Sequence, residues 1–128
     1  MRKSVTVLLA CGVLALGLAA ALAQTPPATT ADTSKGKALV DAKGMTLYIF
    51  DRDAAGKSNC NGQCAVNWPP LMAAADSAAS GDWSVVTRDD GGKQWAYKGK
   101  PLYAFAKDAK SGDVTGDGVN NVWHIAAP

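Results

Sequence analysis

The chain matches itself without a gap when it is shifted by 55 positions. The matched residues are mostly aromatic, Gly or Asp, which chance repeats less readily than Ala. They include four pairs: Tyr48 and Tyr103, Phe50 and Phe105, Asp53 and Asp108, and Trp68 and Trp123. Such a duplication restricts the fold to two copies of one unit, at about residues 37–71 and 92–126, which share one core. We expect the two units to pack about a pseudo-twofold axis.

The secondary structure is expected to be mainly β. All 11 acidic residues are Asp, which favours turns and caps, and the chain contains 13 Gly. The sequence predicts a small single domain of two pseudo-symmetric antiparallel β repeats with long polar loops. Strands are expected at residues 37–41, 45–50, 82–88, 93–98, 101–106 and 122–126, the first two forming a hairpin. Residues 60–68 predict one helical turn, and residues 51–59 and 111–121 predict polar loops.

The N-terminus has the pattern of an export signal. Basic residues at positions 2 and 3 precede a long apolar run that ends in Ala21-Leu22-Ala23, an A-x-A cleavage site. We therefore expect a signal peptide at residues 1–23, cleavage near Ala23, a flexible linker at 24–34 and a folded domain at 35–128. Cys11 lies inside the apolar run and is expected to leave with it. The mature chain is predicted to be periplasmic or secreted, with no transmembrane segment.

The charge balance argues against two classes of partner. The chain has 13 Lys and Arg against 11 acidic residues, and loss of Arg2 and Lys3 makes the two counts equal. Nucleic acids and anionic membranes both require a basic footprint, so neither is expected as a partner. An envelope protein or a small ligand remains possible.

Cys60 and Cys64 remain after removal of the signal peptide. An isolated pair in an exported protein usually forms a disulfide, so we predict one between them. The enclosed loop is very short, so the bond is expected mainly to hold a local turn.

Three segments together carry a resemblance to a known family. KGMTLYIFDRD, CNGQCAVNWPPL and KGKPLYAFAKD, followed by a Gly/Asp-rich loop and a Trp, resemble the bacterial secreted repeat of unknown function. That family is also described as predicted lipoproteins with a Y-x4-D motif, which Tyr48/Asp53 and Tyr103/Asp108 match. The resemblance covers about residues 39–126 and implies a small exported domain, often lipid-tethered, with no assigned activity. This chain lacks a suitable lipid-attachment cysteine, so we expect no lipid anchor.

The repeated residues have a structural and a functional interpretation. Each Asp is expected to accept backbone N–H bonds in the turn after its strand, and each Tyr to pack its ring in the core. The alternative is a paired Tyr/Asp site between the repeats. Trp68 and Trp123 are expected in the core rather than on a ligand-stacking surface, and Trp83 and Trp95 fit either place.

Two parts of the sequence have features of metal sites. Residues 113–124 resemble a Ca²⁺ loop, but His124 stands where a bidentate carboxylate is needed, so a turn-rich loop is expected. Cys60, Cys64 and His124 could instead form a copper site, with Met45 and Met72 as possible thioether ligands. The primary expectation is that the protein holds neither a metal nor a cofactor.

Catalysis finds little support in the sequence. The single histidine and the absence of a nucleophile-elbow motif give no basis for a catalytic triad, and C-x3-C is not the thioredoxin C-x-x-C. We therefore expect a non-enzymatic binding or envelope-associated module of unknown ligand. The alternative is a periplasmic copper-binding or thiol-redox protein that uses Cys60 and Cys64.

Overall fold

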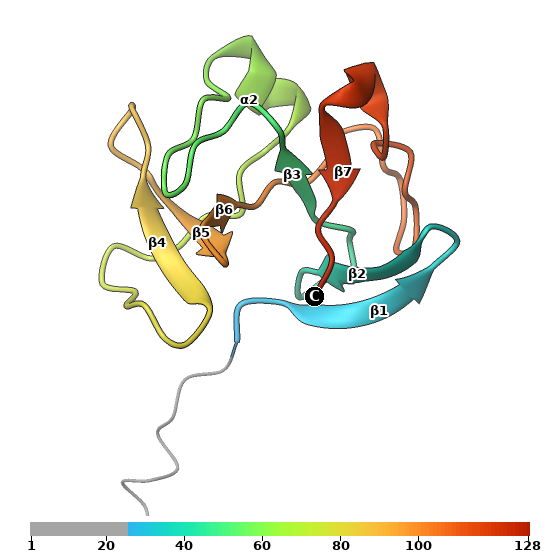
Figure 1. Cartoon of the computed structure of the whole chain (residues 1–128), viewed down its shortest axis with the longest axis horizontal. Coiled ribbons are helices and arrows are strands. Elements are labelled where there is room, and N and C mark those ends of the chain that lie inside the picture. Colours follow the sequence, from blue (N-terminus) through green and yellow to red (C-terminus); the bar gives the residue numbers. More distant parts are fainter. Residues whose placement is uncertain (1–25) are drawn as a thin grey trace, which may run out of the picture.

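The computed structural model describes residues 26–128 as short antiparallel strands joined by long loops (Figure 1). The strands are β1 (Thr29–Thr33), β2 (Gly36–Val40), β3 (Tyr48–Phe50), β4 (Trp83–Thr87), β5 (Lys93–Tyr97), β6 (Lys100–Pro101) and β7 (Trp123–Ile125). A short helix, α2 (Gln63–Asn67), and a 3₁₀ turn, η1 (Val119–Asn121), precede the two repeat-equivalent tryptophans. The sheets are β1–β2, β3–β7 and β4–β5–β6. The mainly β prediction is confirmed.

The two repeats meet at a pair of tyrosine backbones. Tyr48 N–H donates to the carbonyl of Tyr103 at 2.7 Å, and Tyr103 N–H donates to the carbonyl of Tyr48 at 3.0 Å. On either side, Tyr48 pairs with Ile125 of β7 and Tyr103 pairs with Pro70. These two outer pairs exchange under the shift of 55 positions. The repeats are therefore related by the expected pseudo-twofold axis, which passes between Tyr48 and Tyr103.

Side chains alternate along these central segments and build a core on both faces. An aromatic cluster lies on one face: Tyr48, Cys60, Trp68, Tyr103, Phe105 and Trp123. An aliphatic cluster lies on the other: Ala28, Leu39, Leu47, Leu102 and Ala126. The expectation that the strand at residues 45–50 is covered on both sides is confirmed, since Ile49 packs on the aliphatic cluster and Phe50 on the aromatic one.

Four rings of the aromatic cluster form one column. Trp68 and Trp123 stack across the pseudo-axis with ring centroids 3.8 Å apart and planes within 2°. Phe105 stacks on the outer face of Trp68 at 4.0 Å, and Phe50 stacks on the outer face of Trp123 at 4.2 Å. Both faces of each indole are thus covered by other rings. Trp68 and Trp123 are core residues, as expected, and offer no ring face on which a ligand could stack.

The linker expected at residues 24–34 is wrong for residues 28–33. Residues 29–33 form β1, which pairs with β2 from Thr29–Val40 to Thr33–Gly36. Ala28 is only 6% exposed and belongs to the aliphatic cluster, so the domain begins before residue 35. Proline and small polar residues suggested a flexible tether, but the β-branched threonines fit a pleated strand well.

The hairpin expected between residues 37–41 and 45–50 is present. Leu47 N–H donates to the Leu39 carbonyl and Asp41 N–H donates to the Met45 carbonyl, both at 2.9 Å, on either side of an antiparallel bridge between Val40 and Thr46. β2 also pairs along its length with β1, a partner that was not expected. Figure 1 shows the β1–β2 and β4–β5 hairpins on different sides of the molecule, with β3 and β7 side by side. The strand expected at 101–106 is largely irregular, because only Pro101 and the preceding lysine belong to β6.

Several expectations concern other parts of the chain. The signal peptide at 1–23, its cleavage site and Cys11 lie outside the described residues. Within residues 26–128 no helix is long and apolar enough to cross a membrane. Trp83 and Trp95 are half-buried; they meet edge to face at 6.2 Å, and Trp83 also packs against the aliphatic cluster.

We expect Trp68→Ala and Trp123→Ala to lower the free energy of unfolding by similar amounts, about 3–5 kcal/mol each. Each change removes one of two equivalent rings at the centre of the column. Urea unfolding provides the measurement, with Trp83→Ala as a control that should cost less because its ring is half-exposed. A larger loss for Trp83→Ala than for the two stacked residues would contradict this account of the core.

Candidate functional site

The repeated tyrosines and aspartates are paired across the repeats, not within them. The Tyr48 hydroxyl donates to Asp108 Oδ2 at 2.6 Å, and the Tyr103 hydroxyl donates to Asp53 Oδ2 at 2.6 Å. Both tyrosines are fully buried. In each Y-x4-D motif the tyrosine therefore donates to the aspartate of the other motif, and the aspartate accepts from the tyrosine of the other motif.

Each carboxylate also holds the loop that follows its strand. Asp53 Oδ1 accepts the N–H of Asn59 at 2.7 Å, and Asp108 Oδ1 accepts the N–H of Thr115 at 3.0 Å. Each Asp therefore orders the loop after its strand, as expected, and its other carboxylate oxygen accepts a hydrogen bond from the tyrosine of the other repeat. All four groups have hydrogen-bond partners.

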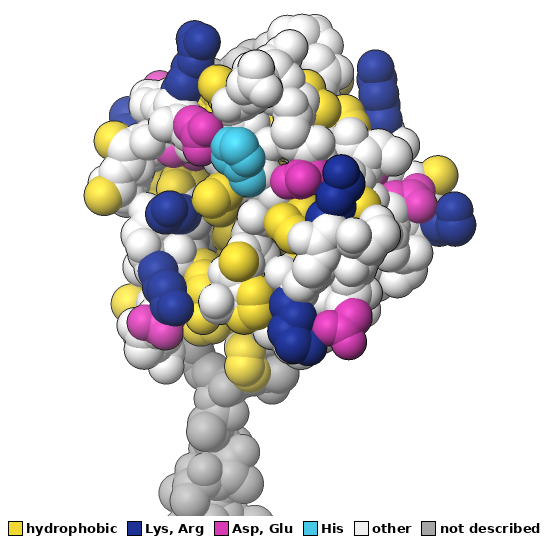
Figure 2. All heavy atoms as spheres, turned by 45° about the vertical axis from the view of Figure 1, so that its right-hand side comes forward, with side chains coloured by type: hydrophobic (Ala, Val, Ile, Leu, Met, Phe, Trp, Pro, Cys, Tyr) yellow, Lys and Arg dark blue, Asp and Glu magenta, His cyan; other side chains and the backbone are white. Residues whose placement is uncertain are grey.

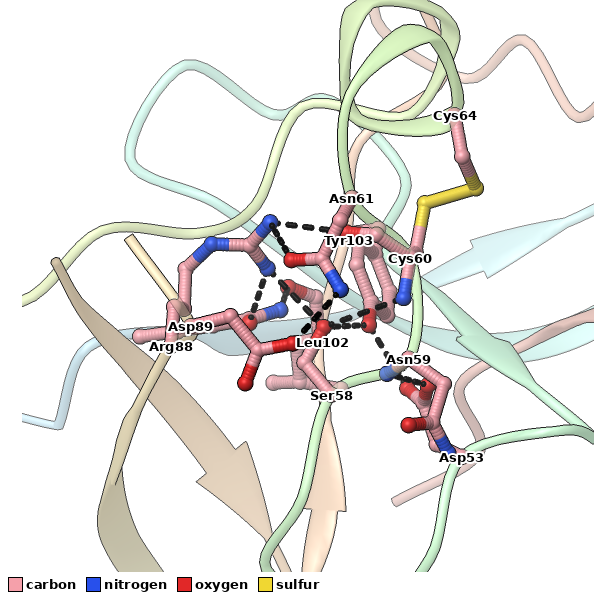
Figure 3. Close-up of a disulfide and its surroundings, with 11 residues drawn as sticks. Asp53, Ser58, Asn59, Cys60, Asn61, Cys64, Arg88, Asp89, Leu102 and Tyr103 are labelled. Atoms are coloured by element: carbon pink, nitrogen blue, oxygen red, sulfur yellow. Dashed lines mark hydrogen bonds between the residues drawn. A yellow bond between two sulfur atoms is a disulfide. The ribbon is translucent and has the colours of Figure 1, made fainter. Parts of the chain in front are cut away.

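A buried arginine, Arg88, connects the Tyr103–Asp53 pair to a polar network beside the disulfide (Figure 3). Arg88 is 4% exposed, and its guanidinium donates to Ser58 Oγ, to Gln94 Oε1 and to the Cys60 carbonyl at 2.7–2.9 Å. Ser58 Oγ lies 2.6 Å from the Tyr103 hydroxyl. The network links the end of β4 to the loop that the disulfide closes. Sequence analysis assigned Arg88 only to a strand, because a buried arginine has no local signature.

Cys60 and Cys64 form the predicted disulfide. Cys60 is fully buried in the aromatic cluster, and Cys64 lies in α2 and packs against it (Figure 3). The bond therefore joins α2 to the segment whose carbonyl is held by Arg88. The copper-site alternative needs two thiolates, and neither cysteine offers a thiolate while the two are joined in a disulfide.

A glycine takes the corresponding place above the other pair. Gly116 N–H donates to the Tyr48 hydroxyl at 3.2 Å. A Cβ atom at this position would lie 2.8 Å from the Trp68 ring, so only glycine lets the loop approach so closely.

In the segment that resembled a Ca²⁺ loop, Asp113 accepts backbone N–H bonds from Ala109 and Lys110. Asp117 accepts one from Ile125. These carboxylates therefore accept backbone hydrogen bonds that hold the turns of the loop.

His124 lies at the surface of β7. Its Nε2 is 2.8 Å from Asp51 Oδ2, and both side chains are nearly half-exposed. In Figure 2 the single histidine stands near the centre of one face, with an acidic side chain beside it. Among the residues that the structure describes, no three His, Cys or Asp side chains come together as a metal site would require.

A cleft of about 230 Å³ opens between the two repeats and has Asp51 in its wall. We call it the lysine cleft; it is lined by residues 49–51, 53–55 and 98–101. A second, mainly apolar hollow of about 280 Å³ shares Ile49, Lys98 and Lys100 with it and continues to Tyr97 and Ile125. Together they form one groove, with the two lysines where its halves meet.

The lysine cleft combines residues that the two repeats share with residues that they do not share. Ile49, Asp51 and Lys100 correspond, after the shift of 55, to Ala104, Ala106 and Met45. Half of the lining is the same in both repeats: Phe50, Asp53, Ala54, Lys98 and Gly99. At the place equivalent to Gly56, Ser111 packs its hydroxyl against Gly44.

The buried tyrosines are poor acids in this setting. Burial, followed by the hydrogen bond to Asp108, raises the pKa of Tyr48 well above its usual value. Burial and then the Asp53 bond raise the pKa of Tyr103 in the same way. Burial also raises the pKa of Asp53, in spite of its bonds from Tyr103 and Asn59 and the nearby Arg88 charge.

We expect strong coupling across the repeats in double-mutant cycles. Tyr48→Phe and Asp108→Ala should show a coupling energy of about 1.5–3 kcal/mol, the range for hydrogen bonds to charged groups. The control is Tyr48→Phe with Asp53→Ala, two residues of one motif that share no hydrogen bond among the described residues, and it should be additive within about 0.5 kcal/mol. Denaturant unfolding measures both, and stronger coupling within a motif would reject the crossed arrangement.

Alkaline titration should show that the two buried tyrosines do not ionise while the protein is folded. Unfolded tyrosines ionise near pH 10, while Tyr48 and Tyr103 keep their protons in the fold, so the free energy of unfolding should fall as the pH rises above about 10. Tyrosinate absorbance followed together with circular dichroism should show these two residues ionising only with unfolding. Reversible ionisation of all 3 tyrosines in a native protein would contradict this.

The family comparison agrees with this architecture. A family model described as a secreted repeat of unknown function matches the chain twice, at residues 29–72 and 84–127. The matches start within a few residues of β1 and β4, and are separated by the same shift of 55 positions. No curated protein and no solved structure matches the chain. The two matches cover most of the chain, which therefore belongs to the family of secreted repeats of unknown function.

Proposed function

We propose that this protein is a non-enzymatic binding module of the cell envelope or the exterior, and that the lysine cleft is its ligand site. The observation that carries the proposal is the groove between the repeats, where the exposed lysines Lys98 and Lys100 adjoin apolar surface. The repeated Tyr, Asp, Trp and Phe side chains hydrogen-bond or stack with one another in the core. The two groove lysines have no such partner and face solvent.

The groove has the mixed character of a small-molecule site. Such sites combine apolar walls with a few polar groups that fix the ligand's orientation. Here Ile49, Tyr97 and Ile125 supply apolar surface, and Lys98 and Lys100 supply the charge. A duplicated core that leaves one groove free to diverge would support a binding role without a catalytic centre.

The non-enzymatic assignment is supported by the state of the buried polar groups. The Tyr48 and Tyr103 hydroxyls donate to carboxylates and have raised pKa values, so neither supplies a proton or a base near neutral pH. Export is supported by the family description, by the signal-like N-terminus and by the disulfide, which persists in oxidising compartments.

Amide chemical shifts measured against a library of small metabolites test the proposal. A ligand should perturb residues 49–54 and 97–101, but not the equivalent residues 104–109 and 42–46, and it should be recovered unchanged. Perturbation confined to the second set, or chemical turnover of the ligand, would overturn it.

The rival function, copper binding or thiol redox chemistry, is tested by counting thiols. Protein isolated from its export compartment should have Cys60 and Cys64 blocked to alkylation unless it is first reduced. Two free thiols that disappear on adding Cu(I) would favour the rival over a binding module.

A further inference from the structure

The two lysines of the groove are charges without partners. Lys98 and Lys100 are exposed, and neither forms an ion pair among the described residues, where Lys37, Lys57 and Lys110 each do. Both lysines line both halves of the groove. Lys98 Nζ also lies 5.2 Å from the centre of the Tyr97 ring, so its ammonium stays close to the apolar half.

The backbone at Lys98 is unusual for a lysine. Lys98 and Gly99 have φ values of 52° and 84° and form the two-residue turn between β5 and β6. A turn with positive φ at both positions favours Asn or Asp followed by Gly. Lys98 is therefore not favoured by the turn geometry, and the first repeat has a lysine, Lys43, at the equivalent position.

The acidic groups of the groove are already engaged. Asp53 accepts hydrogen bonds from Tyr103 and Asn59, and Asp51 pairs with His124. Lys98 and Lys100 are therefore the charged side chains of the groove that have no hydrogen-bond partner among the described residues, and their ammonium groups are free to bind a ligand. It adjoins the apolar hollow lined by Tyr97, Ile125 and the last residues of the chain.

We propose, resting on the binding function above, that the groove takes an amphipathic anion. A carboxylate or phosphate head would lie between Lys98 and Lys100, and a short acyl or aryl tail would cover Ile49 and Ile125. The ligand is a single molecule in solution and not a membrane surface, because the groove is confined and the chain has no broad basic face: Asp51 and Asp53 line the same cleft.

Octanoate, below its micelle concentration, is the first probe, titrated into the mature protein and followed by amide shifts. It should bind saturably at residues 49–51 and 97–101, and its affinity should fall as salt is added. Octanol and octylammonium have the same tail with a neutral and a positive head. Each should bind at least tenfold more weakly than octanoate.

Matched variants test whether Lys98 and Lys100 bind the anionic head of the ligand. Lys98→Gln combined with Lys100→Met should weaken octanoate binding at least tenfold, and Met is the residue that the first repeat carries at the equivalent position. Lys43→Gln is the control, because Lys43 is the exposed repeat-equivalent of Lys98. All three positions are at the surface, so each protein should keep its melting temperature, which is measured first.

The outcomes separate the two proposals. Equal binding of octanol or octylammonium, or an unchanged affinity in the double lysine variant, overturns the anion assignment while leaving a binding groove. If the protein does not bind octanoate but sediments with anionic phospholipid vesicles, the proposal of a single-molecule ligand is overturned. Absence of binding in the groove by octanoate and by the whole metabolite library overturns both proposals.

Discussion

The fold depends on two crossed hydrogen bonds, Tyr48 to Asp108 and Tyr103 to Asp53. A buried hydroxyl or carboxylate without a partner is costly, and neither repeat supplies the partner that its own motif needs. One repeat alone would expose one face of its central segment and leave its tyrosine and aspartate unpaired. The same axis carries the Tyr48–Tyr103 backbone pair and the Trp68–Trp123 stack, so the repeats are expected to fold as one cooperative unit.

The sequence predicts the repeat well, because duplicated residues keep the same place in both copies. Tyr, Phe and Trp at fixed spacing led correctly to two units, a shared core and mainly β structure. The crossing itself is hidden, since the five-residue spacing of the Y-x4-D motif suggests a partner within the motif. β1 was missed for a related reason. Its threonines are typical of a polar linker, and only the pairing with β2 in the tertiary structure shows that they form a strand.

The candidate site was harder to predict because its residues have ordinary local sequences. Lys98 and Lys100 flank a glycine in a turn, and Arg88 ends a strand before two aspartates. Only the tertiary structure shows that Arg88 is buried and that the lysines face a groove. The alignment of the repeats still contained a signal: Lys100 against Met45 is a difference at an exposed position, where a shared core imposes no constraint.

The two halves of the core are also held by different means. The loop above Tyr103 is fixed by Arg88 and the disulfide, while the loop above Tyr48 relies on Gly116 packed against Trp68. Cys60 and Cys64 correspond to Thr115 and Val119 in the second repeat, so no equivalent disulfide is possible there. The lysine cleft lies on the side where Asp53 is held by this extra network. A rigid wall beside a divergent groove is the arrangement that lowers the conformational cost of binding.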